Sequence, residues 1–429
     1  MKKSINLKYG LDKLDLKLAE DKIKGIISPK NIENKELAKI ISEALENPIG
    51  SYKLRDIVSH GETVTLVISD ITRSWQNIDL FLPFIIEELQ AGGIELKDIT
   101  VLSAAGSHRN HTEAEKEELL GSRYYGKINF KDHQAKNSEE LLFLGTTSHG
   151  TPVSLNKALV EAGRLVLTGG IVFHNLAGFA GGRKSLLPGT AAYESIMKNH
   201  SLSLAEKRGD GLKSTIESNI LENNPVHEDM IEAAQFIDTD FIINVIPDGK
   251  GGISNVVAGD LELAHQEGCR ICRKLFGINM NDKADLVIAS AGGFPKDMNL
   301  YQSSKALVNA AKAVNKGGYL ILLADCKEGI GHPEVEDIIQ NYENNLARED
   351  FLREDFTIAR YVGYLITTET EDINCILVSD IEEDSLSTTD IKITDSIENA
   401  LKMVKEEIKE LPQCYIMPNA ANTLPIFKS

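Results

Sequence analysis

The sequence predicts an α/β fold of two α/β domains with mainly parallel sheets and an active site in the cleft between them. The chain has 429 residues and 42% hydrophobic content, enough for more than one core. Short runs rich in Val, Ile and Leu alternate with amphipathic stretches, a pattern typical of parallel sheets covered by helices. Polar clusters follow several of these runs, at the sheet edge where ligands bind, and clefts between domains are frequent ligand sites.

Six apolar runs are predicted to form strands, because they are rich in branched aliphatic side chains and bounded by Gly, Asp or Ser. The runs span residues 63–70, 98–106, 164–172, 240–248, 284–293 and 317–325. Two segments with helical periodicity, 77–93 and 302–318, both stop at Gly-Gly, which is a frequent helix end.

A domain boundary is predicted near Gly277. A helical pattern over 258–278 precedes the boundary, and a new strand unit follows it. We therefore expect an N-terminal domain over residues 1–276 and a C-terminal domain over residues 277–429, with the option that the final segment returns to the N-terminal domain. The acidic, Ser/Thr-rich stretch 380–396 is interpreted as an exposed loop and a short strand.

Charge and cysteine content narrow the class of protein. A net charge of −18 disfavours binding to nucleic acid or to an anionic membrane, and it is typical of a soluble surface. The first residues lack the apolar core of a signal peptide, and no run of about 18 apolar residues predicts a membrane span. Five scattered cysteines indicate a reducing compartment, so we expect the cytoplasm. Cys269 and Cys272 form one CxxC, interpreted as two helical thiols in preference to a zinc site.

The glycine-rich stretch "GFAGGRKS", residues 178–185, is the main motif. A P-loop requires Gly immediately before its lysine, but Arg183 stands there, so the motif disfavours a P-loop nucleotide hydrolase. A nucleotide-dependent phosphotransferase remains the alternative. Gly178, Gly181 and Gly182 would let the backbone approach a flat ligand closely. Lys184 is then a candidate for covalent attachment, because a neighbouring cation favours the neutral amine; the other interpretation is an exposed basic pair.

Three histidines lie near predicted strand ends or near this loop, namely His108, His174 and His200. Two imidazoles on opposite faces of a substrate can act as acid and base, because imidazole titrates near neutrality. A third can bind a metal through a neutral nitrogen. His111 shares the loop of His108 and is the second choice there.

Two groups of residues predict an anionic substrate, since the fork of arginine matches a carboxylate. Arg73 follows Asp70 in a loop after a predicted strand. Tyr301, Gln302 and Lys305 lie at a predicted helix start, where Tyr301 and Lys305 share one face. Ordinary capping and packing is the other interpretation of Tyr301 and Gln302.

Seven segments together resemble the nickel-dependent lactate racemase family. They occur in the family's order between Ser69 and Leu307 and read "SDITR", "GSHRNHTEAE", "GTTSHGTPVSLNKAL", "HNLAGFAGGRKSLLPG", "NPVHEDM", "AGDLELAH" and "GGFPKDMNLYQSSKAL". The resemblance implies that the N-terminal domain binds a nickel-pincer nucleotide, which other enzymes synthesise. The tether implied by the family's motif matches Lys184, the nickel ligand matches His200, and Asp70 matches a cofactor-site position.

The same resemblance implies the activity, inversion of C2 of a 2-hydroxy acid. His108 and His174 match the acid–base pair, and Arg73, Gln302 and Lys305 match positions around the substrate carboxylate. Reversible transfer of the C2 hydrogen as hydride to the cofactor avoids a carbanion, and two opposed bases allow inversion. A cofactor carrier without catalytic activity is a further alternative, and the sequence indicates no oligomeric state.

One departure from the family concerns the substrate. Lactate racemases of this family carry a tryptophan beside the substrate in the C-terminal half, but the single tryptophan here is Trp75. The corresponding region contains Phe356 and Tyr361. We therefore expect lactate or another 2-hydroxy acid, such as malate, a longer-chain acid or a sugar acid.

Overall fold

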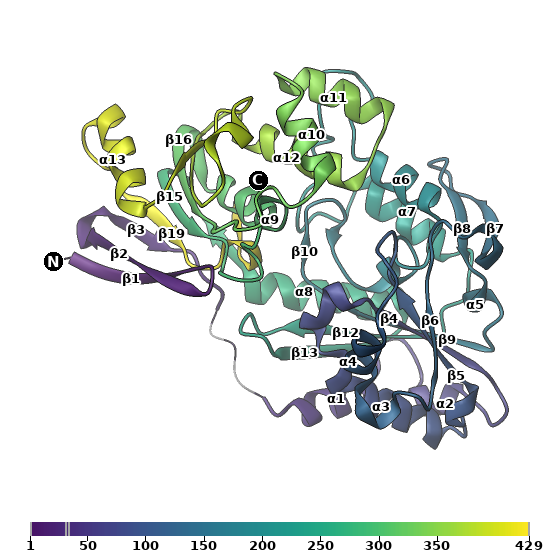
Figure 1. The fold of residues 1–429 in the computed structure, drawn as a ribbon. Coiled ribbons are helices and arrows are strands. Elements are labelled where there is room, and N and C mark those ends of the chain that lie inside the picture. Colours follow the sequence, from purple (N-terminus) through teal and green to yellow (C-terminus); the bar gives the residue numbers. More distant parts are fainter. Residues whose placement is uncertain (1, 31, 33–34, 428–429) are drawn as a thin grey trace. The chain divides into compact units, whose positions relative to one another are not determined.

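The computed structural model describes residues 2–30, 32 and 35–427, and the chain forms two compact units (Figure 1). The N-terminal unit comprises Asn31–Ser203 and Leu212–Leu275. The C-terminal unit comprises Met1–Lys30, Leu204–Gly211 and Phe276–Ser429. Each unit contains a six-stranded, mainly parallel sheet with helices, which confirms the predicted α/β class.

A six-stranded sheet in the order β13-β12-β9-β4-β5-β6 forms the centre of the N-terminal unit. Its strands are β4 (Val64–Ser69), β5 (Ile99–Ala104), β6 (Asn129–Asp132), β9 (Arg164–Gly170), β12 (Phe241–Pro247) and β13 (Ile253–Gly259). Neighbouring strands are parallel, except that β13 is antiparallel to β12. The first five residues of β4 are buried in succession, as expected for a parallel strand covered on both faces.

Eight α-helices and two small antiparallel pairs complete the described part of this unit. The helices are α1 (Leu37–Glu46), α2 (Leu54–Ile57), α3 (Ile78–Ala91), α4 (Glu113–Tyr124), α5 (Lys157–Val160), α6 (Tyr193–Ser201), α7 (Pro225–Ala234) and α8 (Leu261–Phe276). The pairs are β7 (Leu141–Thr146) with β8 (Pro152–Asn156), and β10 (Phe173–His174) with β11 (Gly178–Phe179). Helix α3 packs on the sheet because its apolar residues recur at helical spacing, and burying each such side chain stabilises the fold by about 1.5–3 kcal/mol.

The strand order of the N-terminal unit reverses next to β4. The chain passes from β4 to β5 and β6 on one side, and then returns to β9 and β12 on the other side. The carboxyl ends of β4 and β9 therefore flank the point at which a crevice forms in open α/β sheets.

The C-terminal unit contains a fully parallel sheet in the order β18-β17-β16-β15-β19-β3. Its strands are β3 (Ile23–Ile26), β15 (Ala284–Ser290), β16 (Val314–Leu323), β17 (Asn374–Val378), β18 (Lys392–Thr394) and β19 (Cys414–Met417). The other elements are β1 (Lys2–Tyr9), β2 (Asp12–Ala19), β14 (Gly277–Met280), β20 (Leu424–Phe427), α9 (Leu300–Ala311), α10 (Pro333–Gln340), α11 (Asn345–Glu354), α12 (Ile358–Thr370) and α13 (Ile397–Ile408). In this sheet the strand order reverses next to β15, between β15 and β19.

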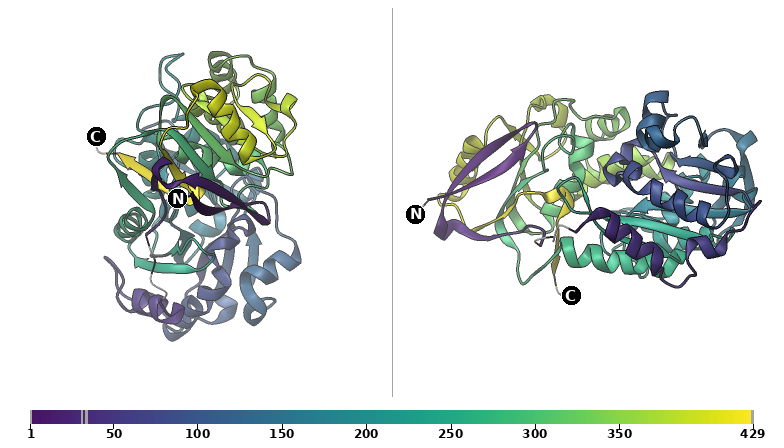
Figure 2. Two further views of the ribbon diagram at one scale, coloured as in Figure 1. Left: turned by 90° about the vertical axis from the view of Figure 1, so that its left-hand side faces the viewer. Right: turned by 90° about the horizontal axis from the view of Figure 1, so that it is seen from below.

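The structure corrects the predicted domain limits at the start of the chain. The predicted boundary at Gly277 agrees with the division before Phe276, but residues 1–30 belong to the C-terminal unit. They do so because β3 pairs with β19, and Leu7 and Leu16 pack into the core of that unit. The last strand, β20, pairs with β14 inside the C-terminal unit, so the chain end does not return to the N-terminal unit. Figure 2 shows the purple N-terminal hairpin beside the yellow C-terminal elements.

All six predicted strands are confirmed, as is the predicted helix over 77–93. The predicted helix over 302–318 is wrong at its end, since α9 stops at Ala311 and β16 begins at Val314. Gly317 and Gly318 lie inside β16, where the register with β15 shifts, so they form an irregularity in a strand instead of a helix end. In the described part of the chain, no helix combines the length and the apolar character that crossing a membrane requires.

Candidate active site

The predicted residues of the N-terminal unit lie after the carboxyl ends of three adjacent strands. Asp70 follows β4, His108 lies in the loop after β5, and His174 follows β9. Gly106 donates its backbone N–H to the oxygen of Gly189 at 2.8 Å, which joins the β5 loop to the segment just beyond Lys184. The sheet therefore gathers these residues around the point of strand reversal between β4 and β9.

Asp70 orients His108. Its Oδ2 lies 2.8 Å from His108 Nδ1, and Thr72 Oγ1 donates to the same carboxylate at 2.8 Å. Burial alone would raise the pKa of Asp70, but the hydrogen bond and charge of His108, the charge of Arg73 and the Thr72 hydroxyl together lower it. An ionised Asp70 fixes the proton of neutral His108 on Nδ1, so Nε2 is the nitrogen that can take up or release a proton.

His111, the second choice in this loop, has a structural role. Its Nδ1 contacts Asp132 Oδ1, and its Nε2 accepts the backbone N–H of Ile71 at 3.0 Å. Both ring nitrogens of this buried side chain are therefore occupied. Because Ile71 directly follows Asp70, His111 holds in place the backbone that carries the carboxylate.

His174 contacts the lysine of the glycine-rich loop. Its Nε2 lies 3.3 Å from Lys184 Nζ, and its Nδ1 accepts the backbone N–H groups of Leu176 and Ala177 at 3.2 and 3.3 Å. The Nε2 nitrogen of His174 is therefore the one that faces the Lys184 amine.

Arg183 is not exposed, so the interpretation of "RK" as an exposed basic pair is wrong. Its side chain is fully buried and donates to the oxygens of Ala177 at 2.9 Å and Gly181 at 3.3 Å. It also donates to His265 Nε2 on α8 at 2.8 Å, and burial lowers the pKa of Arg183 to about 10 and that of His265 well below its usual value. Arg183 therefore fixes the loop that carries Lys184 from the inside.

The glycines of the loop are required by packing within the protein. Gly178 has φ +71°, and a Cβ atom there would lie 2.1 Å from the oxygen of Ile220. Gly181 has φ +80°, and a Cβ atom there would lie 2.4 Å from Asn244 Oδ1. A Cβ at Gly182 would meet the His265 ring at 2.9 Å. Their predicted role beside a cofactor therefore stays a prediction.

The helix at the end of this loop also differs from the helix that follows a P-loop. Gly182–Ser185 forms one short 3-10 helix, whereas a P-loop leads into a longer helix. Ser185, at the position of the metal-binding hydroxyl, donates to the oxygen of Thr168 at 2.6 Å. These contacts disfavour the phosphotransferase alternative.

His200 on α6 has the properties of a metal ligand. It is buried, and its Nδ1 lies 2.9 Å from the oxygen of Ile196. Burial, together with the charge of Lys184, lowers the pKa of His200 to about 3. The ring is thus neutral with its proton on Nδ1, which leaves the Nε2 lone pair for a metal. Among the described residues, no three His, Cys, Asp or Glu side chains converge as a metal cluster.

Arg73 lies in the short 3-10 helix Ile71–Gln76, which follows β4. Its exposed guanidinium donates to Thr72 Oγ1 at 2.9 Å. Trp75 packs against the end of β9, since a Cβ atom at Gly170 would lie 2.6 Å from its ring. The strand-end loop thus carries a cation and an aromatic ring beside Asp70.

Tyr301, Gln302 and Lys305 lie on α9 of the C-terminal unit, a different unit from the one that carries the histidines. The capping interpretation is correct for the Gln302 backbone, whose N–H donates to Asn299 Oδ1 at 2.9 Å. Tyr361 is fully buried in the same unit, whereas Phe356 is half-buried with the two rings 6.2 Å apart. Phe356 is therefore the better candidate for a wall of a substrate site.

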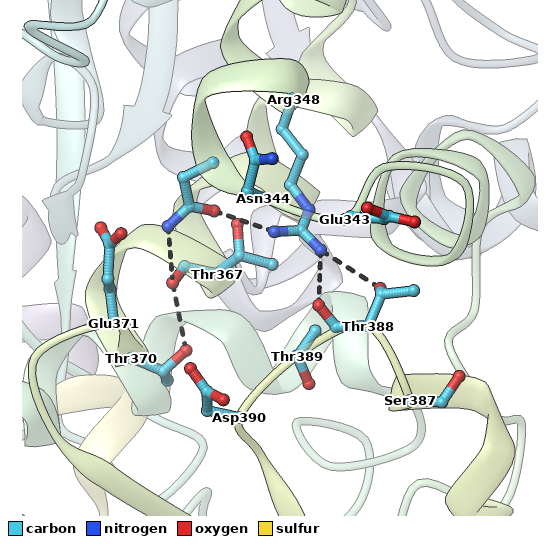
Figure 3. Close-up of a pocket in the computed structure, with 11 residues that line it drawn as sticks. Glu343, Asn344, Arg348, Thr367, Thr370, Glu371, Ser387, Thr388, Thr389 and Asp390 are labelled. Atoms are coloured by element: carbon cyan, nitrogen blue, oxygen red, sulfur yellow. Dashed lines mark hydrogen bonds between the residues drawn. The ribbon is translucent and has the colours of Figure 1, made fainter.

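A separate cavity of about 520 Å³ lies within the C-terminal unit (Figure 3), and no predicted site residue lines it. Arg348 forms its wall and donates to the oxygens of Thr388 and Ile338 and to Asn345 Oδ1. These bonds direct the charge of Arg348 to the protein's own carbonyl and amide oxygens.

Sequence reasoning missed the pairs that join distant segments. Arg183 with His265 and His111 with Asp132 are examples. Residue type was the only signal for either pair. Arg183 is a basic residue at the position where a P-loop has glycine, and His111 is a second histidine three residues beyond His108. Cys269 was placed correctly on a helix; it is a buried free thiol, 3.5 Å from His265 Nε2, and burial raises its pKa to about 12.

Comparison with known proteins agrees with this geometry. The family model for the lactate racemase N-terminal domain matches residues 9–211, and that for the lactate racemase C-terminal domain matches residues 279–424. The lactate racemase of Thermoanaerobacterium thermosaccharolyticum is 35% identical over 331 residues, 76% of each chain. The lactate racemase of Lactiplantibacillus plantarum is 34% identical over 293 residues, 68% of this chain and 66% of the relative.

Solved structures support the same assignment. The lactate racemase apoprotein from Thermoanaerobacterium thermosaccharolyticum has a TM-score of 0.89 at 29% identity, over the full length of both chains. A Thermotoga maritima protein has a TM-score of 0.66 at 18% identity, over 93% of this chain and 100% of the other, and shares the fold. The chain therefore belongs to the lactate racemase family and is an isomerase of the racemase class.

Proposed function

We propose that this protein inverts C2 of a 2-hydroxy acid, with a nickel-pincer nucleotide tethered to Lys184. The observation that carries the proposal is the contact of Lys184 with His174, close to a buried and neutral His200. A tethered nickel cofactor needs a nucleophilic amine and an unprotonated metal ligand, and these residues have the chemistry for both roles.

The donor set fits the cofactor. Lys184 supplies the amine for a thioamide bond, and His200 supplies one nitrogen ligand while its Nδ1–H is held by Ile196. One imidazole cannot hold a nickel ion alone, so His200 would supply a single protein ligand and the cofactor would supply the others. When bound, the cofactor supplies a reversible acceptor for the C2 hydrogen of the substrate.

His108 and His174 act as the acid–base pair. Each takes the hydroxyl proton of one enantiomer and returns a proton when the opposite enantiomer forms. Asp70 stabilises the His108 imidazolium through the 2.8 Å contact. His174 is oriented differently, since its Nδ1 lies against the backbone N–H groups of Leu176 and Ala177 and its Nε2 faces Lys184.

Arg73 binds the substrate carboxylate through its guanidinium fork, and Tyr301, Gln302 and Lys305 on α9 are the further substrate-binding residues. Holding the carboxylate lets only the reacting centre turn between the two bases. Phe356 replaces the family's tryptophan as a wall of the site. The substrate is lactate or another 2-hydroxy acid, such as malate, a longer-chain acid or a sugar acid.

The proposal places the protein in the cytoplasm, together with the enzymes that make its cofactor. All five cysteines are free thiols, as expected in a reducing compartment. The small-molecule substrate and the cofactor-making enzymes are the expected partners.

Mass spectrometry tests the tether. The chain co-expressed with cofactor-making enzymes should carry an adduct on the peptide containing "GGRKS", and racemisation of single-enantiomer 2-hydroxy acids should follow. Lys184→Ala and Lys184→Arg should both lose the adduct, because neither side chain offers an acylable amine. His200→Ala should keep the adduct and lose nickel more readily. An unmodified Lys184 in a fully active enzyme contradicts the proposal.

A further inference from the structure

The C-terminal unit has its own point of strand reversal, between β15 and β19. The chain leaves β15 through Gly292, Gly293 and Lys296 before it enters α9, and it leaves β19 through Asn419. The rule that ligands bind beyond the carboxyl ends of strands at such a point applies here as it does between β4 and β9. The racemase proposal uses none of these residues.

Two lysine side chains pass over adjacent glycines at this point. A Cβ atom at Gly292 would lie 3.2 Å from Lys296 Cδ and 3.6 Å from Lys296 Nζ. A Cβ atom at Gly293 would lie 3.1 Å from Lys8 Cβ and 3.6 Å from its Cδ. Lys296 and Lys8 therefore each contact one residue of the Gly-Gly step, close enough for the charge of Lys8 to act on Lys296.

Neither lysine has an acidic partner among the described residues, and neither ammonium makes a hydrogen bond there. Of the nearby carboxylates, Asp297 accepts the N–H of Gly10 at 2.7 Å and Asp325 pairs with Lys327 at 3.3 Å, each through Oδ2. The Oδ1 atoms of both carboxylates are buried and have no hydrogen-bond partner among the described residues. Burial and the charge of Lys8 lower the pKa of Lys296 to about 8. An anion bound between the two ammonium groups would relieve this repulsion.

Asn419 adds a neutral side-chain amide at the same place. Its Oδ1 lies 3.6 Å from the Cβ position of Gly292, which is also 3.6 Å from Lys296 Nζ. Its side-chain amide makes no hydrogen bond with the described residues. Larger side chains at Gly292 would enter the space between Lys296 and Asn419, so the glycine keeps that space open.

We propose that Lys8, Lys296 and Asn419 form a binding site for a phosphate group at the β15–β19 strand reversal. A phosphate monoester carries a charge near −2 at neutral pH, which matches two ammonium groups better than a single carboxylate does. Free phosphate and the phosphate of a mononucleotide share this chemistry. The site is independent of the proposed racemase activity.

Calorimetric titration of the full chain, without cofactor and in a phosphate-free buffer, tests the site. Inorganic phosphate should bind, and acetate should bind more weakly. Lys296→Met and Lys8→Met should each weaken phosphate binding about tenfold or more, because each removes a charge-assisted hydrogen bond. Lys3→Met is the matched control on the opposite face of β1, where an exposed lysine should leave binding unchanged when it is replaced.

Lys8 is exposed, so Lys8→Met tests the site even if Lys296→Met folds poorly. Adenosine monophosphate identifies the source of the phosphate: tighter binding than inorganic phosphate indicates a nucleotide, and weaker binding indicates the free ion. Absence of phosphate binding to the wild type overturns the proposal. Equal affinity of the wild type and Lys8→Met also overturns it.

Discussion

Replacing Asp70 by asparagine keeps the shape of the side chain and removes its charge. In the wild type, Oδ2 of Asp70 lies 2.8 Å from His108 Nδ1, and the carboxylate is 4% exposed. A hydrogen bond to a charged partner contributes about 1.5–3 kcal/mol, and a neutral amide recovers about half of it. The imidazolium formed at His108 therefore loses about 1–2 kcal/mol, which corresponds to roughly tenfold in kcat.

A second effect can enlarge this loss. If the introduced amide turns its NH2 group toward His108, Nδ1 has to accept a hydrogen bond from it. The proton of the neutral ring then moves to Nε2, which can no longer act as the base. In the Ser-His-Asp triad the equivalent change lowers kcat by about 10⁴. We therefore expect Asp70→Asn to lower kcat by between about tenfold and 10⁴, with a much smaller change in KM. The assay is racemisation of one enantiomer by cofactor-loaded enzyme, followed by chiral chromatography.

Asp132→Asn is the matched control, since Asp132 also contacts a histidine. Both nitrogens of His111 are engaged in structure, so this variant should lower thermal stability more than it lowers kcat. The reasoning is refuted if Asp70→Asn keeps wild-type kcat, or if Asp132→Asn loses as much kcat as Asp70→Asn. Adduct mass should be measured in both variants, so that a lost cofactor is not mistaken for a lost base.

Three further predictions concern the substrate clamp, the acid–base pair and a buried histidine. Arg73→Ala should lower kcat/KM about tenfold or more, and Arg73→Lys should recover only part of it because the fork is lost; steady-state kinetics of both variants decide this. His108→Ala and His174→Ala should each abolish racemisation while nickel content stays near wild type, whereas nickel loss would make that histidine a ligand. Burial lowers the pKa of His133 to about 4, so it should contribute up to about 3 kcal/mol of stability at neutral pH, lost as pH falls from about 6.5 to 4. Urea unfolding across this range should show a smaller pH dependence for His133→Gln, and an unchanged dependence would contradict the assignment.

The strands were predictable because buried parallel strands are short apolar runs whose signal is local. The β1–β2 hairpin was missed, although "INLKYGLDKLDL" alternates apolar and polar residues around Gly10, which has φ +53°. The end of α9 was predicted wrongly because Gly-Gly also fits a strand irregularity, and only pairing with β15 decides between the two.

The candidate site was predictable to the extent that strand ends collect polar side chains. Asp70, His108 and His174 all follow strands, and the order of those strands in the sheet brings them to one edge. The contacts that orient them were not predictable. Arg183 and His265 are 82 residues apart, and nothing in either local sequence indicates that one side chain holds the other. Such pairs depend on tertiary packing, which a single sequence does not encode in its periodicity.

The net charge of −18 does not conflict with binding an anionic substrate or a phosphate group. Exposed charges are screened beyond about 8 Å at physiological ionic strength, so a bound anion responds mainly to the groups beside it. Arg73 in one unit and the Lys8–Lys296 pair in the other are such local cations, each at the carboxyl end of a parallel sheet. Lys296 and Lys8 have no carboxylate partner among the described residues, so binding an anion there does not require breaking an existing ion pair. An acidic surface can therefore keep the protein soluble while the positively charged side chains at each strand reversal remain available to an anionic ligand.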